Sequence, residues 1–271
     1  MESISVNTEY QDKIGYAHGI YTTLSADRSS FLDRARTASE ITIPSLLPEQ
    51  GHTGSSILPT PYQSIGAEGV NNLASKLLLS LLPPNSPFFR LVINDAELEA
   101  LVAGQKGEVE ETLAKIERMV TQEIEVRAFR VPISEALKQL LVAGNVLIYL
   151  PPNDQMRVFR LDRYVVKRDS MGNVLKIVIK ESLSPLSLPE NAKKLLPEPE
   201  EDELPMGNVD LYTCVTWTGR NWTILQELEG EIVPGSEGSY PKNKSPFLAL
   251  RFTHIDGEDY GRGFVEEYIG D

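Results

Sequence analysis

The chain has 271 residues, of which 41% are hydrophobic, enough for one large domain or two of ordinary size. Its 39 acidic and 26 basic residues leave a formal net charge of −13. This argues against a protein that grips nucleic acid over its whole surface, because phosphate binding rests on lysine and arginine. An acidic wall could still line a path along which DNA slides without sticking, but charge alone favours an acidic protein with no such role.

The N-terminal residues and the single cysteine indicate the cellular compartment of the protein. The N-terminal residues MESISVNTEY have neither a basic start nor an apolar run, so we expect no signal peptide. The one cysteine, Cys214, falls in a strand-like run and cannot form a disulfide within the chain. A reducing cytoplasm fits this usage, and we expect the thiol to be buried and inert.

Residues 1–43 are predicted to be helical, in two pieces. The first covers residues 7–24 and is mostly polar. Asp27 is a candidate N-cap for the second, because its side chain could accept a hydrogen bond from the first turn. Four apolar residues share a face of this second helix: Phe31, Ala35, Ala38 and Ile41. Arg28 and the other charges of this helix mix both signs, which is typical of a solvated or subunit-facing surface.

Residues 44–63 are predicted to be irregular, since four prolines and two glycines fall in this stretch. Long unstructured loops in compact proteins are often functional contacts. We favour contact with a neighbouring chain here.

Residues 64–84 are predicted to form the helix around which the chain is organised. Its apolar face repeats at helical spacing through Val70, Leu73, Ala74, Leu77, Leu78 and Leu81. The opposite face carries Glu68, Asn71, Asn72 and Lys76, so the helix does not read as a membrane span. Gly66 and Gly69 lie in the first turn, where alanine would be preferred by roughly 1 kcal/mol each. Either they are loose N-terminal residues or another backbone packs closely against them.

The stretch that follows alternates between strand and helix signals. A strand is predicted at residues 88–93, then a helical region that starts at Asp95, then an amphipathic helix over residues 108–127. Another helix is predicted over residues 134–143, with Ser134 as its candidate cap. It ends at Gly144-Asn145, a typical C-terminal stop, and the apolar run NVLIYLPP then predicts a buried strand.

From residue 156 the chain is predicted to be mostly antiparallel β-structure. Six short segments read as strands: MRVFRL, RYVVKRD, NVLKIVIKE, VDLYTCVTW, NWTILQEL and FLALRFTHI. Turn signals at residues 169–173 and 218–221 predict hairpin loops. Residues 181–207 are rich in proline and acid, and are predicted to be a flexible, exposed insertion.

The predicted fold class is therefore α+β, a helical part packed with a mostly antiparallel β part. The expected divisions are residues 1–150, residues 151–256, and a glycine-rich turn over residues 257–271 that becomes helical near Gly263 and leads toward a further helix.

No catalytic constellation stands out in the sequence. The three histidines are far apart, and His254 alternates with apolar residues, which favours a structural role. Asp256, Glu258 and Asp259 could bind a hard cation, but the loop lacks the ligand order of a Ca²⁺ motif, so a plain acidic turn is favoured. The glycines nearby lack the GK[ST] of a phosphate loop. From the residues alone, we expect an assembly component with no active site, no metal and no cofactor.

Several long stretches, in order, resemble a known family. They are IGAEGVNNLASKLLLSLLPP, EALKQLLVAGNVLIYLP, YVVKRDSMGNVL, GSYPKNKSPF and DGEDYGRGFVEEYIGD, and DRARTASEITIPSLLP is similar to the family's N-terminal region. The family is that of the portal (head-to-tail connector) proteins of short-tailed, autographivirus-type podoviruses. The similarity runs from about residue 27 to the end of the chain.

The resemblance implies a structural viral protein, not an enzyme, that forms a homo-oligomeric ring, typically a dodecamer, at one vertex of the capsid. DNA would pass through the ring during packaging and ejection. The implied partners are the major capsid protein, scaffolding protein, terminase, tail adaptor, internal core proteins and double-stranded DNA, with no membrane. The implied location is the virion, after assembly in the host cytoplasm.

Family members are about twice as long as this chain, which resembles their N-terminal, wing-like half. Channel and motor-docking surfaces are therefore expected mostly beyond Asp271, and the acidic insertion carries no role from the family. Eight positions are candidates for close packing or subunit contact: Gly66, Gly69, Asn71, Asn72, Gly144, Asn145, Gly261 and Arg262. The alternative is a metal-dependent nucleic-acid-processing enzyme that uses Asp256, Glu258 and Asp259.

Overall fold

The structure, a computed structural model, describes residues 15–52, 55–84, 86–92, 103–152, 154–197 and 207–269. The helices of these ranges are α1 (Tyr16–Ile41), α2 (Ile65–Leu81), α4 (Ala103–Val126), α5 (Arg130–Ala143) and α6 (Glu190–Lys193). The strands are β1 (Asn145–Tyr149), β2 (Arg157–Phe159), β3 (Tyr164–Arg168), β4 (Val174–Leu183), β5 (Val209–Trp217), β6 (Asn221–Leu228), β7 (Glu231–Ile232), β8 (Gly238–Pro241) and β9 (Phe247–Arg251). The fold is therefore mixed α+β, as the sequence predicts.

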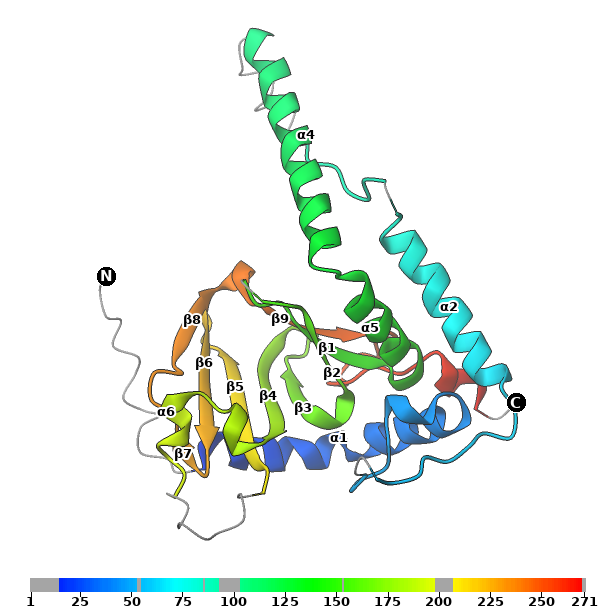
Figure 1. Ribbon diagram of the computed structural model, residues 1–271, viewed down its shortest axis with the longest axis vertical. Helices are drawn as coiled ribbons and strands as arrows, with labels where there is room; N and C mark the ends of the chain where they lie inside the picture. Colours follow the sequence, from blue (N-terminus) through cyan, green and yellow to red (C-terminus); the bar gives the residue numbers. More distant parts are fainter. Residues whose placement is uncertain are drawn as a thin grey trace.

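Two antiparallel sheets form the β part (Figure 1). The smaller has the order β2-β1-β9. The larger runs β3-β4-β5-β6-β7, and β8 also pairs with β6. Both predicted hairpin loops are confirmed, since residues 169–173 join β3 to β4 and residues 218–220 join β5 to β6.

Helix α1 is a long rod that spans the whole body (Figure 1). Its first half packs on the larger sheet, where Ala17 meets Val165, Val178 and Cys214. Its second half packs on α2 and α5 through Ala38, which meets Val70, Ala74 and Leu141. One helix therefore connects the sheet to the helical layer.

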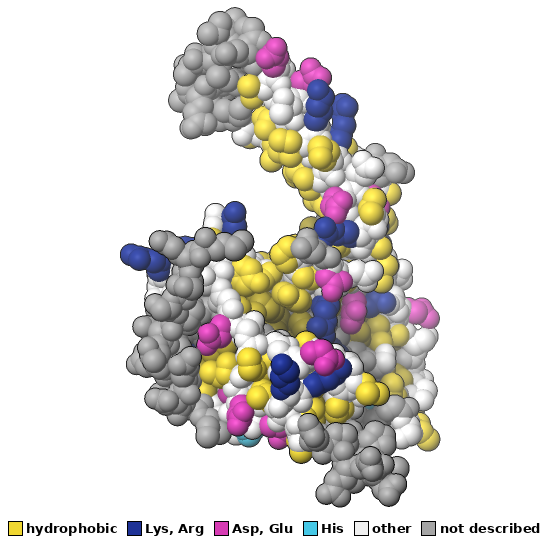
Figure 2. All heavy atoms as spheres, turned by 60° about the vertical axis from the view of Figure 1, so that its left-hand side comes forward, with side chains coloured by type: hydrophobic (Ala, Val, Ile, Leu, Met, Phe, Trp, Pro, Cys, Tyr) yellow, Lys and Arg dark blue, Asp and Glu magenta, His cyan; other side chains and the backbone are white. Residues whose placement is uncertain are grey.

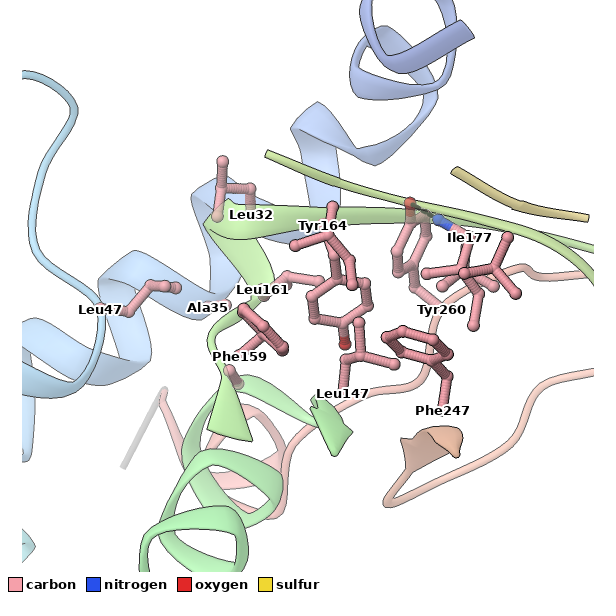
Figure 3. Packing of buried hydrophobic residues seen from close by; sticks show 14 residues of the cluster. Leu32, Ala35, Leu47, Leu147, Phe159, Leu161, Tyr164, Ile177, Phe247 and Tyr260 are labelled. Atoms are coloured by element: carbon pink, nitrogen blue, oxygen red, sulfur yellow. Dashed lines mark hydrogen bonds between the residues drawn. The ribbon is translucent and has the colours of Figure 1, made fainter. Parts of the chain in front are cut away.

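The main core lies between the two sheets and α1 (Figure 3). Leu147 and Phe247 come from the smaller sheet, Tyr164 and Ile177 from the larger one, and all four are almost fully buried. Burial of large apolar side chains at about 25 cal/mol per Å² is the main stabilising contribution here. Tyr260, which follows β9, completes the cluster, and its hydroxyl accepts a hydrogen bond from the backbone N–H of Val166 at 3.0 Å.

A buried carboxylate fixes the start of α1. Glu227 on β6 is fully buried and accepts the backbone N–H groups of Ala17 at 2.7 Å and His18 at 3.0 Å. These N–H groups have no partner inside the helix, and the helix dipole favours negative charge at this end. The sheet thus supplies the cap that the helix sequence lacks.

Helix α4 projects from the body as an arm, and an elbow separates it from α5 (Figure 1). Ala128 in the elbow has φ 52°, a left-handed conformation that ends a helix. Two arginines fix the elbow: Arg127 donates to the carbonyl of Pro152 at 3.1 Å, and Arg130 donates to the carbonyls of Leu82 and Pro83. The arm is therefore held at its base by loops from both the sheet and α2.

Most predicted elements are confirmed, with three corrections. The two N-terminal helices are one continuous helix in the described residues, and Asp27 lies inside it because no glycine or proline interrupts the chain there. Helix α5 begins at Arg130, so Ser134 is not its cap. Residues 88–92 do not form a strand, and the N–H of Leu91 donates to Glu117 on α4 at 2.6 Å instead. Residues 7–14 and the predicted start at Asp95 lie outside the described residues.

The predicted acidic insertion is also different in its described part. Residues 181–183 belong to β4, and Leu188 and Ala192 are buried against Val209 and Leu228. Residues 184–197 therefore pack on the end of the larger sheet instead of being wholly exposed. Residues 198–206 lie outside the described residues.

Candidate functional site

Four of the candidate positions meet at one junction. Gly144 ends α5 with φ 70°, and a Cβ atom there would lie 2.3 Å from the carbonyl carbon of Arg262. A Cβ atom on Gly261 would lie 2.7 Å from the carbonyl oxygen of Thr253. Real Cβ atoms do not approach other atoms so closely, so both positions require glycine. The stretch around Gly261 therefore packs backbone to backbone against the end of α5.

Asn145 connects the two sides of this junction through its buried side chain. Its Nδ2 donates to the carbonyls of Ala143 at 3.0 Å and Gly261 at 2.8 Å, and its Oδ1 accepts the N–H of Gly261 at 2.7 Å. These bonds satisfy buried backbone groups on both sides of the junction. Gly144, Asn145, Gly261 and Arg262 are thus a packing junction within the chain. A role for them in subunit contact remains a prediction.

The other glycine pair has two different environments. A Cβ atom on Gly66 would lie 2.8 Å from the carbonyl oxygen of Ile41, so this glycine lets the start of α2 approach the end of α1. A Cβ atom on Gly69 would meet nothing within 4 Å. Asn71 and Asn72 are exposed. Gly66 therefore has a packing reason inside the chain, whereas Gly69 has none among the described residues.

Gly69 instead faces an open groove of about 610 Å³ beside α2. Its walls come from the end of α1, the proline-rich loop and the stretch after Gly263. The lining is mainly apolar and includes Ile41, Pro59, Tyr62, Ile65, Leu73, Phe264 and Tyr268. Tyr62 and Ile65 are largely exposed. The predicted contact loop thus lies at the edge of an apolar groove, which is the kind of surface that binds another protein segment.

The acidic cluster is occupied by cations of the same chain. Asp259 accepts the Lys167 ammonium at 2.8 Å and the backbone N–H of Arg168 at 2.7 Å. This hydrogen bond raises the pKa of Lys167. Glu258 pairs with Arg262 at 3.1 Å. In the part of the chain that the structure describes, no three His, Cys, Asp or Glu side chains are grouped to hold a metal ion.

Cys214 and His254 lie in different environments. Burial raises the pKa of the Cys214 thiol, as expected for an inert cysteine. His254 is exposed just after β9, so its expected place in an alternating strand is wrong. The strand ends at Arg251, and the alternating pattern does not continue to His254.

Helix α4 keeps an apolar stripe that its own chain leaves open. Ile116, Met119 and Val120 are 42%, 68% and 40% exposed. The hydrophobic side chains run along the arm in Figure 2. Exposed apolar rows on a monomer commonly mark a contact with another molecule. None of the helices in the described ranges is long and apolar enough to cross a membrane.

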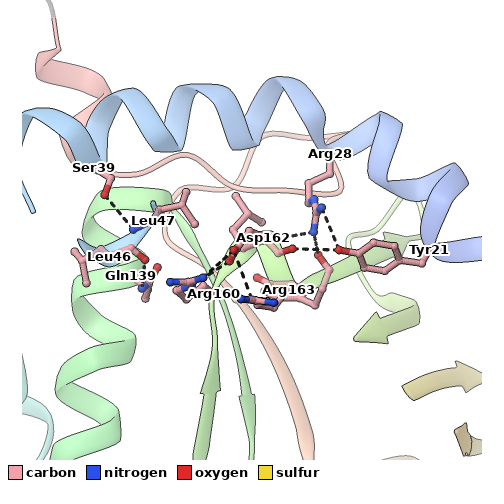
Figure 4. Close-up of polar contacts among 11 residues, drawn as sticks. Tyr21, Arg28, Ser39, Leu46, Leu47, Gln139, Arg160, Asp162 and Arg163 are labelled. Atoms are coloured by element: carbon pink, nitrogen blue, oxygen red, sulfur yellow. Dashed lines mark hydrogen bonds and ion pairs between the residues drawn. The ribbon is translucent and has the colours of Figure 1, made fainter. Parts of the chain in front are cut away.

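Sequence reasoning missed one functional candidate, the set of arginines on and beside α1. Their mixed-charge pattern predicts a solvated face, but Arg28 is only 5% exposed and donates to the carbonyls of Leu161 and Tyr164 at 2.8 and 2.5 Å (Figure 4). The available signal was an arginine at the spacing of the buried face, four residues from both Leu24 and Leu32.

Known proteins identify the family. The model of the family described as "Bacteriophage head to tail connecting protein" matches residues 15–271. Proteins named "Portal protein" from Escherichia phage T7 and Enterobacteria phage T3 are each 39% identical over 94% of this chain and 49% of their own length. The portal protein of Pseudomonas phage phiKMV is 34% identical over 88% of this chain and 48% of its own. The chain spans about half the length of these relatives. It belongs to the family of bacteriophage head to tail connecting proteins.

Proposed function

We propose that the chain is part of a portal subunit, a structural protein that assembles as a ring, a dodecamer by the family resemblance, at one vertex of a phage capsid. The observation that carries this proposal is the family match over residues 15–271, together with relatives that are named portal proteins. In this role the chain has no substrate and no cofactor.

The assembled ring would serve as a conduit for DNA during packaging and ejection. Terminase would dock on it during packaging and a tail adaptor afterwards, with capsid, scaffolding and internal core proteins around it. An acidic channel wall would offer few phosphate contacts and would let DNA pass without sticking. Assembly in the host cytoplasm and residence in the virion belong to the same proposal.

The surface of the chain supports an assembly role. The stripe on α4 and the groove beside α2 are apolar and open, and they lie on different elements. A ring needs two different patches on each subunit, one for each neighbour, whereas a two-fold dimer needs only one. A chain with two separate open apolar surfaces fits the ring better.

The direct test is electron microscopy of the whole protein in which this chain occurs. Rings of about a dozen subunits with a central hole are expected. A strict monomer at high concentration would contradict the proposal. Binding of the ring to free duplex DNA should be weak, since few lysines and arginines are available to replace counterions.

The enzymatic alternative has less support. Asp259 and Glu258 are already paired with Lys167 and Arg262, so a metal would have to displace these cations. Nuclease and ATPase assays with Mg²⁺ on the purified chain, beside Asp259→Ala, decide the question. Activity that Asp259→Ala abolishes would favour the enzyme, and its absence disposes of that alternative.

A further inference from the structure

A hollow of about 820 Å³ lies between α1, the turn after β2 and the loop at residues 48–52. Its lining is polar, in contrast to the groove beside α2. Five cationic side chains line it: Arg28, Arg36, Arg160, Arg163 and Lys180. We call this hollow the arginine pocket. The carboxylates in its lining are Asp33, Glu49 and Asp162.

The charges of the arginine pocket do not balance. Five cations face three carboxylates, which leaves an excess of two positive charges. Asp210, outside the lining, pairs with Lys180 at 2.7 Å and reduces the excess to one. A positive pocket is unexpected on a chain of net charge −13. The pocket is therefore a local region of positive electrostatic potential on a chain whose net charge is negative.

Arg28 is the most deeply buried cation of the arginine pocket. Only 5% of its surface is exposed. It donates hydrogen bonds to the carbonyls of Leu161 and Tyr164 and, at 3.4 Å, to the hydroxyl of Tyr21 (Figure 4). Among the described residues, no carboxylate pairs with it and its Nε has no acceptor. A buried charge is costly unless it is paired. Carbonyl oxygens satisfy hydrogen bonds but do not neutralise the charge.

The other arginines are only partly neutralised. Asp162 is shared by two of them, Arg160 at 2.9 Å and Arg163 at 3.6 Å (Figure 4). Arg36 meets the exposed Asp33 only at 3.8 Å, and its Nε is buried with no acceptor among the described residues. Guanidinium groups bind carboxylate and phosphate groups with two parallel hydrogen bonds. The pocket thus offers guanidinium groups of incompletely neutralised charge to an oxyanion-bearing ligand.

Shape and charge favour a flexible acidic peptide over duplex DNA. DNA is stiff over about 50 nm, so a duplex cannot bend into a hollow of this size. An extended peptide presents its carboxylates one at a time and can follow the hollow. A chain with several carboxylates in a row matches the several arginines best.

The sequence itself contains a run of acidic residues. Five of the six residues at positions 198–203 are acidic, the densest run of charge in the chain: Glu198, Glu200, Glu201, Asp202 and Glu203. We propose that the arginine pocket binds the acidic run at residues 198–203 of a second copy of this chain. The proposal rests on the proposed ring, in which each subunit meets its neighbour through two different surfaces. The run and the pocket are two such surfaces with opposite charge.

Peptide binding tests the pocket without requiring a ring. A fluorescent peptide that spans residues 197–206 is titrated with the full chain, and its anisotropy is followed. Saturable binding that weakens with salt is expected. The double variant Arg36→Gln/Arg163→Gln should lower the affinity about tenfold, because each partly exposed charge pair contributes up to about 1 kcal/mol. The Gln/Asn version of the peptide should not bind.

The matched control is Arg220→Gln/Lys244→Gln, which removes the same charge from exposed positions outside the pocket. It should leave the affinity unchanged. Equal loss in both double variants would mean general charge attraction and would overturn the proposal. A charge swap sharpens the result: Arg36→Glu/Arg163→Glu should reject the acidic peptide and accept one in which lysines replace the acids.

Two competition experiments distinguish an acidic peptide from other oxyanion ligands of the pocket. Inorganic phosphate and a short DNA duplex are each added to the peptide complex. Neither should displace the peptide at matched charge and constant ionic strength. Displacement by phosphate would make the pocket a site for a small oxyanion, and tighter binding of the duplex would make it a nucleic-acid site. Either result overturns the assignment to an acidic peptide.

Cross-linking tests whether the run comes from a second copy. The one cysteine of this chain, Cys214, is buried, so it does not compete with the introduced thiols. Gln50→Cys at the pocket edge in one copy and Glu201→Cys in another, carrying a tag of different mass, should form a mixed disulfide on oxidation of the whole protein. A disulfide that forms only when both cysteines lie on one chain would overturn the second-copy assignment. Rings seen without any cross-link would refute the pocket contact and leave the proposed function intact.

Discussion

Helices α4 and α5 follow each other in the chain and have similar apolar spacing, yet they use it differently. α5 buries Leu137, Leu141 and Val142 against α1 and α2. α4 leaves Ile116 and Met119 open. The same amphipathic pattern therefore predicts a helix in both cases but does not predict what covers its apolar face. The body is stabilised by its own contacts, whereas the apolar stripe of the arm is exposed.

The largest effect is expected at the junction in the body. Gly144→Ala should lower the free energy of unfolding by about 4 kcal/mol, because the left-handed conformation is strained and the Cβ overlaps the backbone of Arg262. Urea unfolding followed by circular dichroism measures this. Gly257→Ala is the control, since Gly257 also has a positive φ, of 78°, but nothing lies within 4 Å. Equal losses in both variants would mean that the close approach contributes nothing.

A cavity in the main core should have the next largest effect. Leu147 is fully buried between the sheets, and Leu147→Ala should lower the free energy of unfolding by about 3 kcal/mol. Urea unfolding is again the measurement. A loss below about 1 kcal/mol would show that the interface between the two sheets tolerates rearrangement and that the body is less tightly packed than its burial indicates.

The body should also lose stability at high pH. Burial raises the pKa of Tyr260 to about 12 from its ordinary 10.0, against the smaller lowering effect of the Val166 N–H. The unfolded chain therefore ionises this hydroxyl from about pH 10 while the folded chain resists until about 12. The contribution is present below pH 10 and is lost as the pH rises through 12, about 2 to 3 kcal/mol in all.

Urea unfolding between about pH 9 and 12 measures this loss, with Tyr260→Phe for comparison. The variant should be less stable near neutral pH by about 1 kcal/mol, because the Val166 N–H loses its acceptor. Its stability should then fall less steeply above pH 10, although burial also raises the pKa of Tyr164 and leaves some slope. An unchanged slope would remove Tyr260 as its cause.

The two glycines of α2 should give opposite results. Gly66→Ala should lower the free energy of unfolding by about 1 to 2 kcal/mol, because its Cβ would lie 2.8 Å from the Ile41 carbonyl oxygen. Gly69→Ala should raise it by up to about 1 kcal/mol, because alanine favours helix and the space is open. If Gly69→Ala leaves stability improved but prevents ring assembly of the whole protein, the groove beside α2 is a subunit contact.

The smallest effect on stability is expected in the arm. Met119→Ser should change the free energy of unfolding of the chain by less than about 0.5 kcal/mol, since Met119 is 68% exposed. Sedimentation of the whole protein should nevertheless show weaker assembly. A loss of stability above about 1 kcal/mol in the monomer would mean that the stripe is packed within its own chain, and the contrast between arm and body would fail.

Periodicity and turn chemistry predict most of the elements of this fold. Helix α2 and the hairpin of β3 and β4 follow from apolar spacing and from glycine in the loop. The packing partners do not follow from these local signals. Phe88 and its neighbours have strand propensity, but a strand also needs a pairing edge, and no strand in the described part of the chain pairs with residues 88–92.

The junction was predicted in part, and the arginine pocket was not. Gly144, Asn145, Gly261 and Arg262 are candidates from the sequence, but only the structure shows that positions 116 residues apart meet. In the sequence Arg28 is one of several charged residues on a helix. Sequence spacing does not show that it donates hydrogen bonds to the carbonyls of Leu161 and Tyr164. Long-range polar contacts of this kind depend on the tertiary fold.

The elbow at Ala128 has a mechanical consequence. Because Arg127 is bonded to the carbonyl of Pro152 and Arg130 to that of Pro83, the base of α4 is attached at two separate points. A sideways force on the arm would therefore become a torque shared by the loop after β1 and the end of α2. Neither loop would yield alone, so the arm would act as a lever that tilts the helical layer and the smaller sheet together.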